Sequence, residues 1–345
     1  MIKATYKKYL LNFKNPSGTS RGILKTKETW FFILEENDKL GIGETGLFRG
    51  LSIDDVYNYE NKLMWVCANI SRGLDFLLKE LCNFPSLQFG LEQAFLSLRS
   101  ETPFELFPSL FTEGKKVIPI NGLVWMGDKE FMKNQIKDKL ETGFSCIKMK
   151  IGAIDFEAEI ELLRTIRNEF SSQEIELRVD ANGAFNPNSA LEKLKKLSEL
   201  EIHSIEQPIK QGQVQEMASL CFKSPLAIAL DEELIGVFSL QEKKKLLATI
   251  KPQYIILKPS LIGGFMGSTE WIHLAQQNNC GWWITSALES NIGLNAIAQF
   301  THTLNSSLPQ GLGTGGLFSN NFTSPLAIKN GTLKYHPEKS WNFNL

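Results

Sequence analysis

Three acidic residues, Asp180, Glu206 and Asp231, stand at the ends of short apolar runs. The runs read IELRVD, HSIEQP and LAIALD, and they recur about 25 residues apart, which is the length of one strand and one helix of a β/α barrel. Converging carboxylates supply the hard oxygen ligands that Mg²⁺ prefers. No histidine ends a matching run, which argues against a zinc site or a histidine-rich iron site. The pattern predicts a Mg²⁺ site, with Mn²⁺ as the second choice of ion.

Lysines flank these acids in the sequence. Lys148 and Lys150 lie in CIKMKIG before the first acid, and Lys258 lies in YIILKPS after the last. Because side chains alternate along a strand, Lys148 and Lys150 point to one face and their apolar neighbours to the other. Paired ammonium groups beside a metal ion lower each other's pKa, as a lysine base near neutral pH requires. We expect Lys258 to donate a proton or stabilise negative charge from the opposite side.

The elements that position these residues are expected to form a modified (β/α)7β barrel of the TIM type. Such barrels carry their active sites at the carboxyl ends of the strands. Helices are expected at 129–142 and 156–170. The expected strands are 117–124, 145–150, 175–180, 202–206, 226–231, 254–258, 282–286 and 308–312.

Simpler roles are open for each residue. An acid that ends a strand can cap the helix that follows it. Strand alternation alone also admits Glu232 or Glu233 as the third metal ligand. The lysine pair could instead be solvated on an edge strand. The prediction of a site depends on the charged residues occurring together at successive strand ends.

The first part of the chain predicts a different domain. Residues 1–115 are expected to form an α+β capping domain with strands and helices at 2–13, 29–35, 52–81 and 91–98. The polar stretch 15–28 between the two strands contains glycine and proline breaks. It is expected to be a mobile lid over the barrel mouth, with Ser20 and Arg21 contacting the substrate. The barrel is expected at 116–319, and the tail 320–345 is expected to return to the capping domain.

Two further segments are candidates for substrate binding. TSALES places Ser286 and Glu289 after the seventh expected strand, and GLGTGG places Gly313 and Thr314 after the eighth. Backbone N–H groups of a glycine-rich loop can bind an anion. The alternatives are helix capping by Ser286 or Ser290 and a flexible exit from the last strand.

Composition limits the classes of partner. The chain has 345 residues, a net charge of −1 and no basic block, so neither nucleic acid nor an anionic membrane surface is expected. No apolar run reaches the length of a membrane span or of a signal-peptide core. The five scattered cysteines favour reduced thiols and a cytoplasmic location. The expected partner is a small-molecule carboxylate, and the sequence does not indicate an oligomeric state.

At this point the motifs resemble a known family. The lysine pair, the three acids and Lys258 together resemble the muconate-lactonizing-enzyme subgroup of the enolase superfamily, over nearly the whole chain. The resemblance implies that the three acids bind Mg²⁺. It also implies that Lys150 is the base, that Lys148 assists it and that Lys258 acts from the opposite face. The mandelate-racemase subgroup uses a late histidine, and no histidine ends the seventh expected strand here.

Within the subgroup, the segments IKMKIG, RVDANGAF, IEQP, ALDE and LKPSLIGG are most similar to the o-succinylbenzoate synthase family. This implies Mg²⁺-dependent dehydration through an enediolate in menaquinone biosynthesis. Dipeptide epimerases and N-succinylamino acid racemases share the enediolate and remain the alternative. Epimerases carry an acidic pair near the eighth strand, where GLGTGG has no acid. Two other interpretations remain. One is a non-catalytic barrel that binds a metal or an anion, and the other is a barrel enzyme that binds phosphate.

Overall fold

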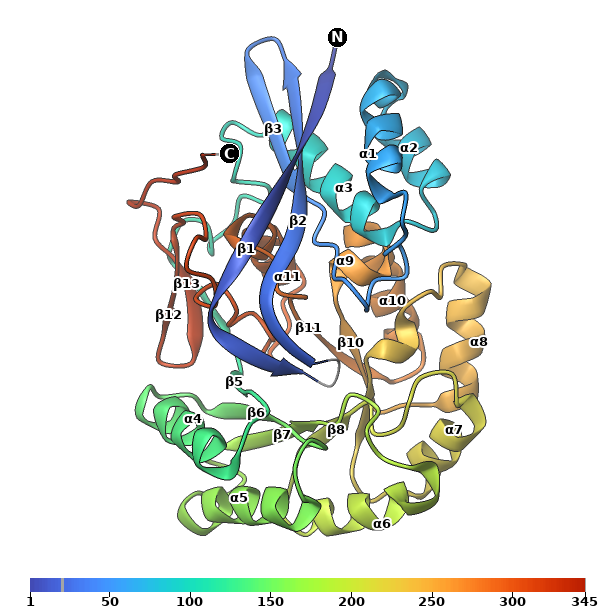
Figure 1. The fold of residues 1–345 in the computed structure, drawn as a ribbon, viewed down its shortest axis with the longest axis vertical. Helices are drawn as coiled ribbons and strands as arrows, with labels where there is room; N and C mark the ends of the chain where they lie inside the picture. Colours follow the sequence, from blue (N-terminus) through green and yellow to red (C-terminus); the bar gives the residue numbers. More distant parts are fainter. Residues whose placement is uncertain (20–21, 345) are drawn as a thin grey trace.

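The computed structural model describes residues 1–19 and 22–344. Figure 1 shows an N-terminal hairpin and a small group of helices set against a larger β/α barrel, which the chain builds from its middle and C-terminal parts. The fold matches the expected TIM-like barrel with an N-terminal α+β domain.

The barrel wall is one parallel sheet. Within the described residues it has seven strands in chain order: β5 (Gly122–Val124), β6 (Cys146–Lys150), β7 (Glu176–Asp180), β8 (Ser204–Glu206), β9 (Ile228–Leu230), β10 (Tyr254–Leu257) and β11 (Gly281–Ile284). Bridges from Gln310 to Ile120 and from Gly311 to Thr285 close the ring where an eighth strand was expected. The parallel order brings the carboxyl ends of the strands to one rim.

Helices cover the outside of this wall. They are α4 (Lys129–Glu141), α5 (Phe156–Glu169), α6 (Pro187–Ser198), α7 (Val214–Lys223), α8 (Leu240–Ile250), α9 (Pro259–Ile262), α10 (Gly264–Gln277) and α11 (Asn291–Thr303), with the 3-10 turn η2 (Glu232–Leu234) after β9. Start signals in the sequence are clear at α5 and α6. Asp155 accepts backbone N–H groups at the start of α5, and Pro187 opens α6.

The N-terminal domain pairs an antiparallel sheet with helices. The sheet has the order β1 (Lys3–Thr19), β2 (Gly22–Glu36) and β3 (Lys39–Glu44). The helices are α1 (Tyr59–Ala68), η1 (Ile70–Arg72), α2 (Leu74–Glu80) and α3 (Pro85–Arg99). Helix α3 is buried almost throughout and packs on β3. Gly41 and Gly43 of β3 allow this close approach, because a Cβ on either would collide with the α3 backbone.

The polar stretch 15–28 differs from the expected loop. Strands β1 and β2 continue through it as a hairpin, paired as far as Thr19 and Gly22. The register shifts between Asn12 and Ser17, which accommodates the proline within β1 because proline lacks a ladder donor. Antiparallel pairing satisfies the backbone of this polar ribbon, although the side chain of Lys27 within it is buried. Ser20 and Arg21 lie outside the described residues.

The first expected barrel strand is divided in two. Val117–Pro119 forms β4, which pairs with β13 (Thr332–Tyr335) and so joins β12 (Leu326–Lys329) in a separate sheet. The later part, Gly122–Val124, pairs with β6 in the barrel wall. The tail then reaches the N-terminal domain, where Trp341 stacks on Phe104 and Phe343 packs against Phe31. None of the helices in residues 1–19 and 22–344 is long and apolar enough to cross a membrane.

Candidate active site

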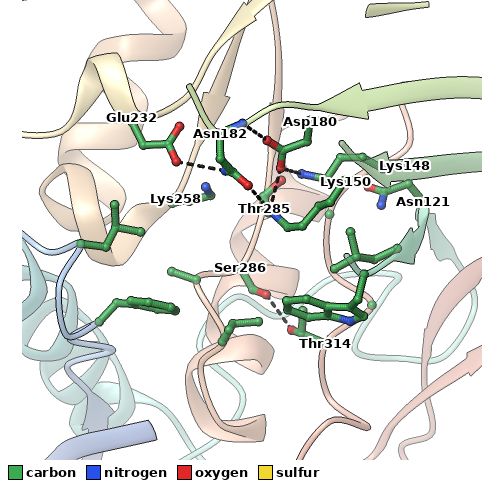
Figure 2. A pocket seen from close by; sticks show the side chains of 18 residues that line it. Asn121, Lys148, Lys150, Asp180, Asn182, Glu232, Lys258, Thr285, Ser286 and Thr314 are labelled. Carbon is green, nitrogen blue, oxygen red and sulfur yellow. Dashed lines mark hydrogen bonds and ion pairs between the residues drawn. The ribbon is translucent and has the colours of Figure 1, made fainter. Parts of the chain in front are cut away.

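The charged residues predicted from the sequence meet at the carboxyl ends of β6 to β10. They form an alternating series of ion pairs around the rim. Lys150 Nζ lies 2.9 Å from Asp180 Oδ2, and Lys148 Nζ lies 3.0 Å from the same oxygen and 2.7 Å from Glu206 Oε2. Lys258 pairs with Asp231 and lies 4.0 Å from Glu206 Oε1. Figure 2 shows Lys148, Lys150 and Asp180 converging from one side and Lys258 entering from the other.

Burial makes these pairs strong. Asp180, Glu206 and Asp231 are each at most 2% exposed, and Lys148 is 5% exposed. Burial alone would lower the pKa of Lys148, but Asp180 and Glu206 outweigh it and leave this pKa raised. Two carboxylates within hydrogen-bonding distance thus hold up the pKa of Lys148, and the lowering expected beside a metal ion stays a prediction. Burial alone would raise the pKa of Asp180, yet the neighbouring lysines hold it below its ordinary value.

The acidic residues fit a divalent cation by their chemistry. Glu206 Oε1 is buried and accepts no hydrogen bond within the described structure. Burial raises the pKa of Asp231, and the neighbouring Glu232 and Glu206 add to the rise despite Lys258. Crowded, partly unsatisfied carboxylates of this kind favour a bound cation. In the described part of the chain, the acids do not already converge as a set of three ligands, because each is turned toward an ammonium group.

Beside the lysines lie Asn182, which was not predicted, and Glu232, which was considered only as an alternative metal ligand. Asn182 Oδ1 accepts a hydrogen bond from Lys150 Nζ at 2.7 Å, and Asn182 Nδ2 donates to Glu232 Oε1 at 3.0 Å. Both side chains line the cavity (Figure 2). Asn182 orients the Lys150 ammonium, and Glu232 orients Asn182. A signal for Asn182 was present in the sequence, because RVDANGAF places it two residues after Asp180. In the structure Asn182 has a positive φ of 43°.

The remaining wall of the cavity is largely apolar. Ser286 and Thr314 line it and share a hydrogen bond of 2.6 Å, and Gly313 lies beside them. Thus these three predicted contacts do border the cavity. The apolar side chains come from both domains: Phe48, Leu51, Leu123, Trp125, Ala287 and Leu288.

Two buried polar atoms face the same cavity without a protein partner. They are Asn121 Oδ1 and Thr285 Oγ1, neither of which makes a hydrogen bond within the described residues. Asn121 is 4% exposed and Thr285 is 9% exposed. Buried polar atoms normally find a partner, so both are available to a ligand. Asn121 was not predicted, because it lies at the break between β4 and β5.

Glu289 lies elsewhere than expected. It is fully buried behind the cavity wall, where its carboxylate accepts hydrogen bonds from Ser260 Oγ at 2.6 Å and Ala287 N at 2.7 Å. It is not among the residues that line the cavity. Its position ties the loop after β10 to the loop after β11, which is a structural role.

Comparison with known proteins agrees with this geometry. Residues 132–339 match the family model described as Enolase C-terminal domain-like. The chain belongs to the enolase superfamily. It is 47% identical to an o-succinylbenzoate synthase of Desulfotalea psychrophila, over 96% of this chain and 98% of that protein. The crystal structure of MenC from the same organism superposes with a TM-score of 0.86 at 44% identity, covering 96% of this chain and 99% of that one.

A more distant member of the superfamily is an L-Ala-D/L-Glu epimerase of Francisella tularensis subsp. novicida. It is 26% identical, over 68% of this chain and 65% of that protein. Membership of the enolase superfamily implies a divalent metal cofactor, in keeping with the buried carboxylates at the ends of β7, β8 and β9. The chain is thus an enzyme of this superfamily.

Proposed function

We propose that this enzyme is an o-succinylbenzoate synthase. It would convert 2-succinyl-6-hydroxy-2,4-cyclohexadiene-1-carboxylate to o-succinylbenzoate and water, in menaquinone biosynthesis. The observation that carries the proposal is the 47% identity to the Desulfotalea psychrophila synthase over nearly the full length of both chains. The site supports it, because Lys150 and Lys258 approach one cluster of buried carboxylates from strands β6 and β10.

We propose Mg²⁺ as the metal, held by Asp180, Glu206 and Asp231. These ligands offer only carboxylate oxygens, which suit a hard cation that keeps open positions for substrate. When bound, the ion supplies positive charge that offsets the negative charge developing on the substrate carboxylate. The unsatisfied Glu206 Oε1 supports this assignment.

The lysines divide the remaining work. Lys150 takes the proton alpha to the substrate carboxylate, and Asn182 holds Lys150 in place for that transfer. Lys148 adds fixed positive charge from between Asp180 and Glu206. Lys258 stays protonated and stabilises the enediolate from the opposite face. Lys150 then gives its proton to the beta hydroxyl group, which leaves as water while the ring becomes aromatic.

The test is a comparison of kcat/KM for this substrate with kcat/KM for a panel of dipeptides and N-succinylamino acids. We expect the cyclohexadiene to be the best substrate by far. Residues Gly311–Gly316 offer no carboxylate to a substrate ammonium, and burying that charge without a partner is costly. A higher kcat/KM for any amino-acid derivative would replace the synthase with an epimerase or racemase. We also propose a cytoplasmic location, which the five free thiols favour.

A further inference from the structure

Helix α10 begins without a cap of its own. Its N-cap position is Gly263 and its first residue is Gly264, so neither can accept a hydrogen bond through a side chain. The N–H groups of Phe265 and Met266, at the start of α10, instead donate hydrogen bonds to Glu92 of helix α3. Met266 N lies 3.0 Å from Glu92 Oε1. A helix normally receives this acceptor from its own N-cap residue. Here the acceptor comes from the N-terminal domain.

Helix α11 has a side-chain cap of its own, since Ser290 Oγ accepts a hydrogen bond from Ile292 N, and a second glutamate of the N-terminal domain adds to it. Ser290 is its N-cap, and Gly293 stands at the third helical position, where a capping box would carry glutamate or glutamine. Glu44, at the end of β3, takes that role. Its carboxylate accepts hydrogen bonds from Ser290 N at 3.0 Å, Ser290 Oγ at 2.5 Å and Gly293 N at 2.9 Å, and Thr29 Oγ1 supports it at 2.9 Å.

Glycine is required at both helix starts. A Cβ on Gly264 would collide with the Glu92 carboxylate, and a Cβ on Gly293 would lie 2.9 Å from Glu44 Oε2. Glu92 is 7% exposed and Glu44 is fully buried. The preceding barrel helix offers a contrast, since α8 has an ordinary capping box within itself, formed by Ser239 and Glu242.

The two capped helices follow the loops that carry active-site groups. Lys258 stands at the end of β10, just before α9 and α10, and Ser286 to Leu288 stand between β11 and α11. The hydrogen bond from Ser260 to Glu289 joins these two loops to each other. The N-terminal domain therefore contacts the backbone at the far end of each loop.

We propose that Glu92 and Glu44 are positioning residues: by capping α10 and α11 from the other domain, they set the placement of Lys258 and of the wall around Ser286. Glu92 acts on the loop that carries a charged group needed in the transition state. Glu44 acts on the loop that shapes the binding cavity. The two residues should therefore affect different kinetic constants. The substrate used to measure these constants rests on the proposed function.

The experiment compares Glu92→Gln and Glu44→Gln with the matched control Glu242→Gln, which alters a capping box confined to the barrel. A small displacement of a reacting group lowers the reaction rate strongly. We therefore expect Glu92→Gln to lower kcat about tenfold with little change in KM. We expect Glu44→Gln to raise KM about tenfold, with little change in kcat, because the cavity wall moves. Glu242→Gln should leave both constants unchanged.

Amide hydrogen exchange gives a second readout that needs no turnover. Exchange should become faster at 258–266 in Glu92→Gln and at 285–293 in Glu44→Gln, but at neither segment in Glu242→Gln. If a glutamine variant does not fold, Glu92→Asp and Thr29→Val weaken the same caps and should shift the same constants less. Unchanged kinetics and exchange in folded variants would overturn the proposal. If the wild-type enzyme lacks synthase activity, only the proposed function fails, and the exchange result still decides the role of the caps.

Discussion

At the scale of single residues, the position of Lys150 separates it from the other lysines. Lys148 is enclosed by two carboxylates, and Lys258 is paired with Asp231. Lys150 shares Asp180 with Lys148 and has the neutral amide of Asn182 as its other partner. A group that must gain and lose a proton is better served by a neutral neighbour than by a second carboxylate.

Replacing Lys150 with alanine should therefore abolish most of the turnover. Loss of a general base typically costs about 10²–10⁴-fold in rate. Metal affinity, measured by titration calorimetry with Mg²⁺, should persist because the three acids remain. Near-normal kcat in Lys150→Ala would transfer the role of base to Lys148 or Lys258.

Removal of divalent ions should also abolish activity. EDTA treatment followed by Mg²⁺ should restore the rate of the wild-type enzyme, but not that of Glu206→Ala, Asp180→Ala or Asp231→Ala. The reason is that each acid is buried at the end of its strand, where its carboxylate is expected to bind the ion. Glu232→Ala is the matched control, because this acid interacts with Asn182 and should retain metal binding. Full activity of metal-free enzyme would exclude the assignment.

At the scale of elements, the hairpin of β1 and β2 is the segment whose structure was predicted least well from the sequence. Its base is fixed to the C-terminal part of the chain, through Lys14 N to Leu317 O at 2.8 Å and Ser319 N to Asn12 O at 2.9 Å. The register shift lies just beyond this anchor. A bend at that point would let the outer hairpin close over the barrel rim.

We predict that the hairpin acts as the lid expected from its sequence. Saturating substrate or product should slow amide exchange in residues 15–28, because closure excludes water from the enediolate. Deleting Gly18–Gly22 should raise KM. Exchange that is equal with and without ligand would argue against a lid, as would normal kinetics after the deletion.

The sequence predicted the five strands β6 to β10 well, because each was a short apolar run ending in a charged residue. It did not predict the hairpin, since proline and glycine signal a loop locally, whereas pairing with a distant strand decides the outcome. It also assigned Val117–Val124 to one strand, because nothing local shows that β4 pairs with β13. Glu289 was placed at the substrate for a similar reason. Its position near Ser286 was visible, but its bond to Ser260 was not.

At the scale of the whole molecule, the contact between the domains should respond to pH through Glu92. Burial raises the pKa of Glu92 from an ordinary value of 4.5 to about 7. In the unfolded chain this carboxyl loses its proton near its ordinary pKa, so between pH 4.5 and 7 the folded protein binds the extra proton. The contribution of Glu92 to stability therefore falls as pH rises through that window, and it is constant above it.

Glu92→Gln removes this titration. Its free energy of unfolding, relative to that of the wild type, should rise between pH 5 and pH 8 by up to about 3 kcal/mol. Urea unfolding at several pH values measures the difference, and Glu242→Gln provides the pH-independent control. A difference in the free energy of unfolding between wild type and Glu92→Gln that stays constant over this pH range would contradict the raised pKa of Glu92.

The pairing of β1 with residues 317–320 also has a consequence for biosynthesis. Tyr9 and Asn12 hydrogen-bond to Asn320, so β1 reaches this partner only after residue 320 has been made. At about 5–20 residues per second, a ribosome takes roughly 15–60 s to cover that distance. Throughout this time the nascent hairpin lacks its final neighbours, and its apolar face is open to chaperones. Residues 317–320 thus complete the surroundings of β1 long after the strand itself has been made.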